Sequence, residues 1–432
     1  MRDLAARLRD IVRKDHGGGA LAPSRELTYV PETDGMAADP SRAARALGGT
    51  LLEADQGVCV VIDRVWEESH GHGRDSVGSC APSADGPLGL FDARAAAAPA
   101  WFERVVFFDL ETTGLSGGAG TLPFLAGCGW FEGGAFRVRQ FFLASPAGER
   151  AMLHALARIF DDATLLVTFN GRTFDVPLME TRWAFHRAAA PTGDLPHFDM
   201  LPPARRLWGA RGLDDAMQPS SCALSSLERS VLGFHRVGDV PGFEIPLRYF
   251  QFLRSGHAET MEGVLEHNRH DLLSLAAVMS HALWLAREGP DACREPSEQM
   301  GLGRLYERAG DHDRALVAFE RASSATSEIR EHALARLATL LGRVRRHDEA
   351  AAAWQALLDE TRRRRGPASA LARRAVEALA IHHEHRARDL STARTFAIEL
   401  RTHADERAQR AAAHRLGRID RKLDAKSGGR LL

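Results

Sequence analysis

The sequence predicts an α/β sandwich around a mixed sheet, followed by an all-α domain of helical repeats. Short apolar runs alternate with helix-like segments between residues 101 and 286, which is typical of a sheet flanked by helices. After residue 287, a pattern of small and large apolar residues recurs 35 residues later, which indicates stacked helix pairs. A chain of 432 residues has room for both parts and a preceding lead-in.

Composition limits the classes of protein to consider. Hydrophobic residues make up 44% of the chain, enough for a sizeable core. Residues 287–432 carry 29 Lys+Arg against 22 Asp+Glu, whereas residues 1–286 carry 27 against 35. The five cysteines are scattered without a Cys-x-x-Cys pair, so neither a zinc site nor a disulfide framework is expected. No apolar stretch has the length of a signal peptide core or a membrane span, so we expect a cytoplasmic protein that does not bind membranes.

The lead-in, residues 1–100, is predicted to be loosely structured. Residues 15–48 are rich in Gly, Ala, Pro and Asp, and Gly57–Val65 is the one convincing strand. His70 and His72 follow that strand, and a metal pair is one interpretation of them. A polar loop is the preferred interpretation, because no third ligand lies near in sequence.

The central domain, residues 101–286, is predicted from a succession of strand and helix signals. Strands are expected at Val105–Phe108, Leu125–Phe131, Ala135–Leu143 and Thr164–Phe169, with a hairpin turn at Glu132–Gly134. Helices are expected at Gly148–Phe160, from Asp175, at Leu224–Leu232 before Gly233, and at Val264–Met279. His197–Leu201 is interpreted as an edge strand that enters a helix.

Two acidic residues close the first of these strands. Asp109 and Glu111 are separated by Leu110, so their side chains point to the same face of the strand. Adjacent carboxylates repel each other, and a cation between them relieves that repulsion. Oxygen ligands suit Mg²⁺ or Mn²⁺. A solvated acidic strand end is the alternative, and the apolar run before the acids together with the Thr-Thr-Gly-Leu turn after them favours the metal site.

Two further acidic positions follow other elements. Asp175 begins a helix after the turn at Asn170, and a plain helix cap is the alternative role for it. Asp271 interrupts the apolar pattern of the long helix, with His267 four residues earlier on the same face. A surface pair is the alternative for these two. His270 is adjacent to Asp271 and is therefore rotated by roughly 100° from it.

Together these residues resemble the three exonuclease motifs of the DEDD superfamily. The sequence is most similar to the YprB-like ribonuclease-H-like exonuclease domain over roughly residues 101–286, with a weaker echo at 51–73. The similarity includes His197–Leu201 (HFDML), Pro241–Gly242, and His267–Leu275 (HNRHDLLSL). It implies a ribonuclease-H-like fold and two-metal hydrolysis of phosphodiesters at a single-stranded DNA or RNA 3′ end.

The resemblance also implies roles for the residues. Two divalent cations, Mg²⁺ or Mn²⁺, would be held by four acids: Asp109, Glu111, Asp175 and Asp271. His267 is expected to be the general base, because a neutral imidazole can accept a proton from water. Superfamily members with a histidine usually place it five residues before the last acid, whereas here the spacing is four. Three polar neighbours are predicted to contact the substrate: Thr112, Asn170 and Asn268.

Several polar residues in the domain have more than one interpretation. Asp199 is interpreted as a cap, with an accessory site role as the alternative. Five arginines are considered as phosphate contacts, although exposed arginines often have no such role: Arg205, Arg206, Arg229, Arg236 and Arg248.

The tail, residues 287–432, is predicted to form tetratricopeptide-like repeats. The first copy is marked by Leu302, Gly303, Tyr306, Ala315, Phe319 and Ala322, and the second by Leu337, Ala338, Leu341, Ala350, Trp354 and Leu357. Such repeats can be a packed core alone or a surface for a protein or nucleic acid. Residues 361–432 carry 18 basic against 8 acidic residues, which is compatible with phosphate binding or with a solvated face.

Three classes of function are therefore compatible with the sequence. The leading one is a metal-dependent 3′→5′ exonuclease. The others are a non-catalytic nucleic-acid-binding module on the same fold and a scaffold that recruits a partner through the repeats. Four acids at one site count against pure nucleic-acid binding, because without metal they would repel phosphate.

Overall fold

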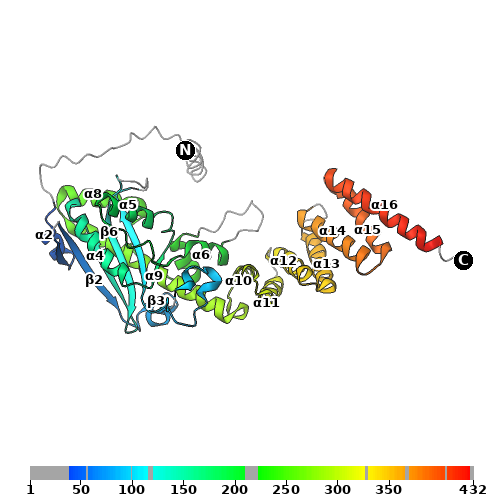
Figure 1. Cartoon of the computed structure of the whole chain (residues 1–432), viewed down its shortest axis with the longest axis horizontal. Helices are drawn as coiled ribbons and strands as arrows, with labels where there is room; N and C mark the ends of the chain where they lie inside the picture. The colour runs from blue at the N-terminus through cyan, green and yellow to red at the C-terminus, as the bar shows by residue number, and fades with distance from the viewer. Residues whose placement is uncertain are drawn as a thin grey trace. The chain divides into compact units, whose positions relative to one another are not determined.

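A seven-stranded mixed sheet forms the centre of the first part of the chain (Figure 1). The computed structural model describes residues 38–54, 57–98, 100–114, 120–209, 222–325, 329–364, 369–403 and 406–428. The strand order is β1-β2-β7-β6-β5-β8-β9. The strands are β1 Thr50–Ala54, β2 Gly57–Trp66, β5 Val105–Thr112, β6 Pro123–Glu132, β7 Ala135–Phe142, β8 Leu165–Thr168 and β9 His197–Asp199.

Helices occupy the connections of this sheet. They are α2 Pro40–Ala46, α3 Leu88–Phe91, α4 Glu149–Asp161, α5 Asp175–Phe185, α6 Leu201–Leu207, α7 Leu224–Leu227, α8 Ile245–Ser255 and α9 Glu262–Glu288. A π-helical turn, η4 Glu228–Leu232, continues α7 and ends at Gly233, whose φ of 67° is left-handed. A small hairpin, β3 Gly71–His72 and β4 Asp75–Ser76, lies apart from the main sheet.

The mixed character of the sheet follows from its connections. Strands β5, β6 and β7 are antiparallel, and β6 turns into β7 through Gly133 and Gly134, both with positive φ. Strand β8 runs parallel to β5, and β9 runs parallel to β8. A parallel neighbour requires a crossover, which α4 supplies before β8 and α5 supplies before β9.

Alternate side chains of β5 face the two sides of the sheet. Val105 and Phe107 belong to the buried cluster that includes Leu272 of α9. Val106 and Phe108 belong to the opposite cluster, which α4, α5 and α8 cover. Because side chains alternate along a strand, Asp109 and Glu111 fall on the α9 side. The two predicted acids are thereby directed towards the third acidic segment.

The lead-in is more ordered than the sequence predicts. Strand β2 lies where the sequence predicts one, but it pairs with β7 inside the main sheet, and β1 pairs with β2. The prediction of a loosely structured lead-in is therefore wrong for residues 38–98, and a boundary at residue 100 would divide the sheet. Residues 1–37 lie outside the described part of the chain.

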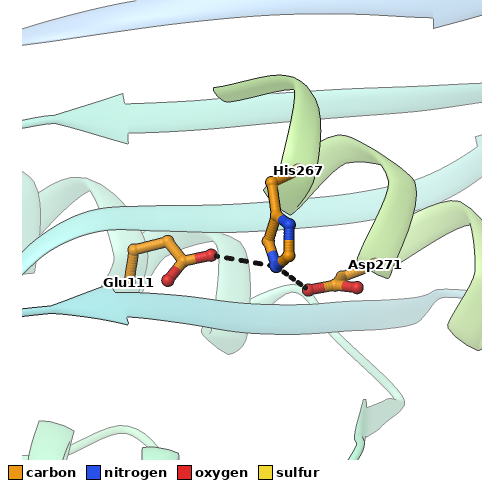
Figure 2. Close-up of side chains that lie close together, drawn as sticks. All are labelled: Glu111, His267 and Asp271. Carbon is orange, nitrogen blue, oxygen red and sulfur yellow. Dashed lines mark ion pairs between the residues drawn. The ribbon is translucent and has the colours of Figure 1, made fainter. Parts of the chain in front are cut away.

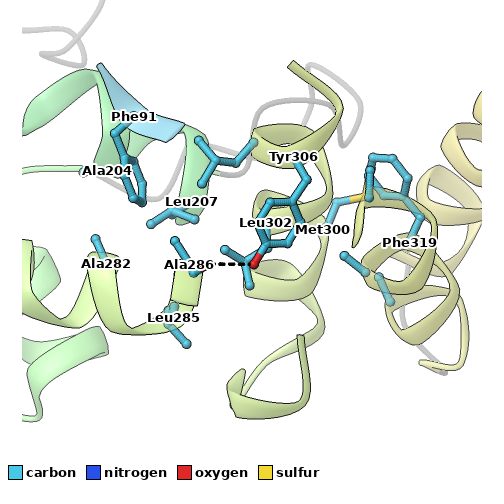
Figure 3. Packing of buried hydrophobic residues seen from close by; sticks show 14 of the residues in the cluster. Phe91, Ala204, Leu207, Ala282, Leu285, Ala286, Met300, Leu302, Tyr306 and Phe319 are labelled. Atoms are coloured by element: carbon cyan, nitrogen blue, oxygen red, sulfur yellow. Dashed lines mark hydrogen bonds between the residues drawn. The ribbon is translucent and has the colours of Figure 1, made fainter. Parts of the chain in front are cut away.

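The helical tail continues directly from the core of the first part. Leu207, Leu285 and Ala286 belong to the same buried cluster as Leu302 and Tyr306 (Figure 3). The Tyr306 hydroxyl donates to the Ala286 carbonyl at 3.0 Å, and the Trp208 indole donates to Glu298 at 3.1 Å. A boundary at residue 286 would therefore cut through buried packing.

Seven helices are described in the tail, and each contacts the next along the chain. They are α10 Pro296–Ala309, α11 His312–Ser323, α12 Ile329–Arg343, α13 His347–Arg364, α14 Ala370–His385, α15 Leu390–His403 and α16 Glu406–Gly428. A Cβ on Gly303 would lie 2.4 Å from the Phe319 ring, so glycine there permits the close approach of α10 and α11. Within the described residues, no helix is long and apolar enough to cross a membrane.

Candidate metal centre

The first two acids lie where β5 leaves its regular pairing. Asp109 is opposite Gly127 of β6, and the register shifts between Glu111 and Thr112. The Thr112 hydroxyl donates to the Gly114 carbonyl at 2.9 Å, which closes the turn after the strand. The irregularity therefore ends the strand at its acidic residues, as bulges near functional sites often do.

Helix α9 brings an amide to the first acid. Asn268 is fully buried and donates from Nδ2 to Asp109 Oδ2 at 2.8 Å. Its Oδ1 accepts from Gln140 Nε2 at 2.8 Å, and Arg269 Nε donates to Gln140 Oε1 at 2.9 Å. This chain of bonds fixes the Asn268 amide orientation. Asn268, which the sequence predicts to contact substrate, holds an acid of the site in place.

Asp271 and His267 lie one helical turn apart on α9 and face Glu111 (Figure 2). His267 Nε2 is 3.3 Å from Asp271 Oδ2 and 3.9 Å from Glu111 Oε1. Each of the three side chains offers one ligand atom, and these atoms lie within 4.8 Å of one another. His270 points elsewhere: its Nε2 is 3.2 Å from Glu266, and its ring lies edge-on to Phe234.

Asp175 is the first residue of α5 and is buried. Phe174 occupies the N-cap position, and no side chain caps the start of this helix. Asp175 is therefore not a plain helix cap, which was the alternative role considered for it. Its charge raises the pKa of both Asp109 and Glu111, which indicates that all three acids share one region. The carboxylates thus come from β5, α5 and α9.

Burial and mutual repulsion raise the pKa of three of these acids. Burial raises the pKa of Asp109 well above its usual value, and the charges of Asp271, Glu111 and Asp175 add to that rise. The pKa of Glu111 is also raised well above its usual value, first by burial and then by Asp271 and Asp175. Burial raises the pKa of Asp175 to about 7. Without a cation, the fold therefore favours protonated acids here.

Arg236, a loop residue, reaches the site. It is one of the five arginines considered as phosphate contacts. Arg236 donates to Asp271 Oδ1 and, through Nη1, to Asp239 Oδ2 at 3.2 Å. Glu228 of η4 accepts two bonds from the same guanidinium, at 2.9 and 2.5 Å. Asp239 also accepts from His267 Nδ1 at 2.8 Å. Burial alone would raise the pKa of Asp239, but the bond from His267 and the nearby positive charges lower it overall.

Two other predicted polar residues support the backbone. Asn170 has a left-handed φ of 68° and is exposed, and its Oδ1 accepts from Thr173 at 3.0 Å. Asp199 accepts from the backbone amides of Asn170, Arg172 and Leu201. Asp199 thus joins the Asn170 turn to the first residue of α6, whose N-cap position is held by Met200 and not by Asp199.

The two histidines of the lead-in lie in different environments. His72 is buried, and its Nε2 lies 2.9 Å from the Ser274 hydroxyl of α9. His70 is exposed. His72 thus fastens β3 to α9, which differs from the predicted polar loop.

The acidic residues fit divalent cations chemically. Carboxylate oxygen is the donor that Mg²⁺ and Mn²⁺ prefer, and two positive ions would offset the four carboxylates, three of which, Asp109, Glu111 and Asp175, have pKa values that burial raises. Asp109, Glu111, Asp175 and Asp271 are the residues that would hold such ions. Arg236 supplies one positive charge to this set of acids, which alone is too little to balance it.

Comparison with known proteins agrees with this fold. Residues 106–283 match the RNase_H superfamily, and the mixed seven-stranded sheet with its flanking helices has a ribonuclease-H-like fold. The chain is also similar to the uncharacterized protein YprB of Bacillus subtilis (strain 168), at 33% identity over 256 residues. That match covers 59% of this chain and 60% of the relative.

Proposed function

We propose that this chain is a metal-dependent 3′→5′ exonuclease of the DEDD type. The observation that carries the proposal is the convergence of four carboxylates from three separate elements, with the pKa of three of them raised by burial. Burying acids together is costly unless a cation compensates them. Folded proteins retain such an arrangement mainly at functional sites.

The roles of the side chains follow from their contacts. Two bound ions would supply a water of lowered pKa and stabilisation of the leaving oxygen. Asp109, with one oxygen held by Asn268, has its other oxygen available for an ion. His267 donates a hydrogen bond from Nδ1 to Asp239, so its Nε2 is directed at Glu111 and Asp271. We propose that Nε2 accepts the proton of the attacking water.

We propose a single-stranded 3′ end of DNA or RNA as the substrate and the cytoplasm as the location. The helical tail is proposed to form tetratricopeptide-like repeats. In support, the residues of both predicted copies are buried or half-buried between helices. Such a stack can present a surface to a protein partner or to the nucleic acid.

The direct test is digestion of single-stranded DNA and RNA labelled at the 3′ or the 5′ end. With Mg²⁺ or Mn²⁺, we expect immediate release of the 3′ label and stepwise shortening of the 5′-labelled strand. EDTA should abolish both. Binding without any hydrolysis would favour a nucleic-acid-binding module, and internal cuts would contradict an exonuclease.

A further inference from the structure

The loop between η4 and η5 (Gly242–Glu244) presents two charged side chains to the candidate site. The loop is fixed at both ends: the Phe234 ring lies 4.0 Å from the His72 ring, and Val240 is buried. Between these anchors, Arg236 and Asp239 form hydrogen bonds to side chains of α9. By contrast, the side chain of Val237 points to solvent and is 95% exposed. The anchored backbone of the loop therefore directs the side chains of Arg236 and Asp239 towards α9.

Arg236 is held more firmly than a surface arginine. Its side chain is 7% exposed and its partner Glu228 is 2% exposed, and two bonds join them in a fork. The turn that carries Glu228 is itself held by Arg74, which donates to the Val231 carbonyl at 2.7 Å. A planar guanidinium in a fork has little freedom to rotate, so its remaining donors have fixed directions.

As a result, the two carboxylate oxygens of Asp271 have different partners. Arg236 Nη2 donates to Oδ1, whereas Oδ2 lies on the side of His267 Nε2 and Glu111. One oxygen of Asp271 is thus occupied by protein, and the other faces the place where the acids converge. The same loop also fixes His267, because Asp239 Oδ1 accepts from Nδ1 at 2.8 Å.

We propose that Arg236 and Asp239 are positioning residues for the metal centre, an inference that rests on the proposed function. Arg236 limits Asp271 to a single metal-facing oxygen. Asp239 directs His267 Nε2 into the site. At 2.8 Å from Nδ1, against 3.3 Å for Arg236 Nη1, it favours the tautomer whose proton is on Nδ1. Partners of this kind typically change metal affinity or activity by 10–100-fold.

The test for Arg236 is Mn²⁺ binding to the full chain, measured by electron paramagnetic resonance. Arg236→Lys keeps the charge but loses the fork, so we expect affinity to fall by about 10–100-fold. Arg229→Lys, on an exposed neighbour of Glu228, is the matched control and should bind as the parent does. Equal or tighter Mn²⁺ binding by Arg236→Lys would overturn the inference.

A second readout separates positioning from a purely structural role. Mn²⁺ raises the melting temperature of a protein that binds it only when folded. For Arg236→Lys, we expect a smaller Mn²⁺-induced rise than in the parent, whatever its melting temperature in EDTA. A lower melting temperature in EDTA with an unchanged rise would overturn the proposal and show that Arg236 only supports the fold.

The test for Asp239 is Asp239→Asn, which can present an amide N–H to Nδ1 and reverse the tautomer. We expect Mn²⁺ affinity within about threefold of the parent but hydrolysis reduced by about 10–100-fold. Parental hydrolysis by this variant would overturn its role. If the parent hydrolyses no nucleic acid, the proposed function fails, while the Mn²⁺ measurements on Arg236→Lys still decide the positioning of Asp271.

Discussion

At the scale of single residues, Asp109 and Asp175 are two of the four acids that are proposed to hold the ions. We predict that Asp109→Asn and Asp175→Asn each lose nearly all hydrolysis, by at least about a hundredfold, because each removes a metal ligand. Both variants should stay folded, since the amide removes a buried charge that the fold disfavours. Labelled-strand digestion and thermal melting measure the two effects. Asp194→Asn, at an exposed position, is the control, and full activity of either site variant would refute the assignment.

The two histidines of α9 give the second prediction. His267 faces Glu111 and Asp271, whereas His270 contacts Glu266, so only His267 can act on a water at the site. His267→Ala should reduce the rate on the order of 10²–10⁴-fold while metal still binds. His270→Ala should change the rate little.

A rate measured against pH completes that comparison. The rate should rise with pH in the parent, and this limb should vanish in His267→Ala, because a base must be unprotonated to act. If His267→Ala loses metal as well as activity, the imidazole is a ligand and not the base.

The third prediction concerns pH and stability in EDTA. Burial raises the pKa of Asp175 from 3.8 to about 7, so the folded chain keeps this proton longer than the unfolded chain. The stability from this group is fully present below its unfolded pKa and is lost as pH rises through 7. Denaturant melts should therefore show the parent losing more stability between about pH 5 and about pH 8 than Asp175→Asn. Parallel pH curves for the two proteins would contradict the raised pKa.

What the sequence predicts at this scale depends on how local the signal is. Asp109 and Glu111 stand out because a buried apolar run leads directly into them. Arg236 and Asp239 could not be assigned, because their roles arise from pairing with α9 some 30 residues away. Glu228 acts through Arg236, and each of the three alone resembles an ordinary surface charge. Gln140 was missed for the same reason, since it looks like one polar residue of a strand.

At the scale of elements, the site depends on how closely α9 approaches β6. A Cβ on Gly127 would lie 2.2 Å from Asn268 Oδ1 and 2.8 Å from Leu272, so only glycine fits between them. We predict that Gly127→Ala costs about 1–3 kcal/mol of stability by overpacking and weakens Mn²⁺ binding through displacement of Asn268. Denaturant melts and Mn²⁺ titration measure these effects. Gly71→Ala, with no atom within 4 Å of its Cβ, is the control.

The elements of the central domain follow the sequence signals closely. The strands and helices from β5 to β9 lie at the apolar runs and periodic segments that predict them. Strand β1 was missed because it is a partly exposed edge strand without a continuous apolar run. The pairing of β2 with β7 joins residues about 80 positions apart, and a short-range pattern holds no information about such a contact.

At the scale of the whole molecule, the tail and the first part share a core. A chain that ends at residue 288 keeps all four acids but exposes Leu207 and Leu285, which pack in the cluster with Tyr306. We predict that it is less stable by a few kcal/mol, at about 1.5–3 kcal/mol per large buried side chain. A chain that ends at residue 325 keeps α10 and α11 and should retain parental stability of the first part. Equal melting temperatures for the two shortened chains would contradict the shared core.

Diffraction from crystals soaked in Mn²⁺ shows whether the four acids form a centre for two divalent ions. Anomalous scattering locates Mn²⁺ without assumptions about the protein. We predict two Mn²⁺ ions about 3.5–4 Å apart. Asp109 should contact at least one of them, and Glu111, Asp175 and Asp271 should complete the set. Crystals with no Mn²⁺ at Asp109, or with Mn²⁺ bound only at other residues, would show that these acids are not the metal centre.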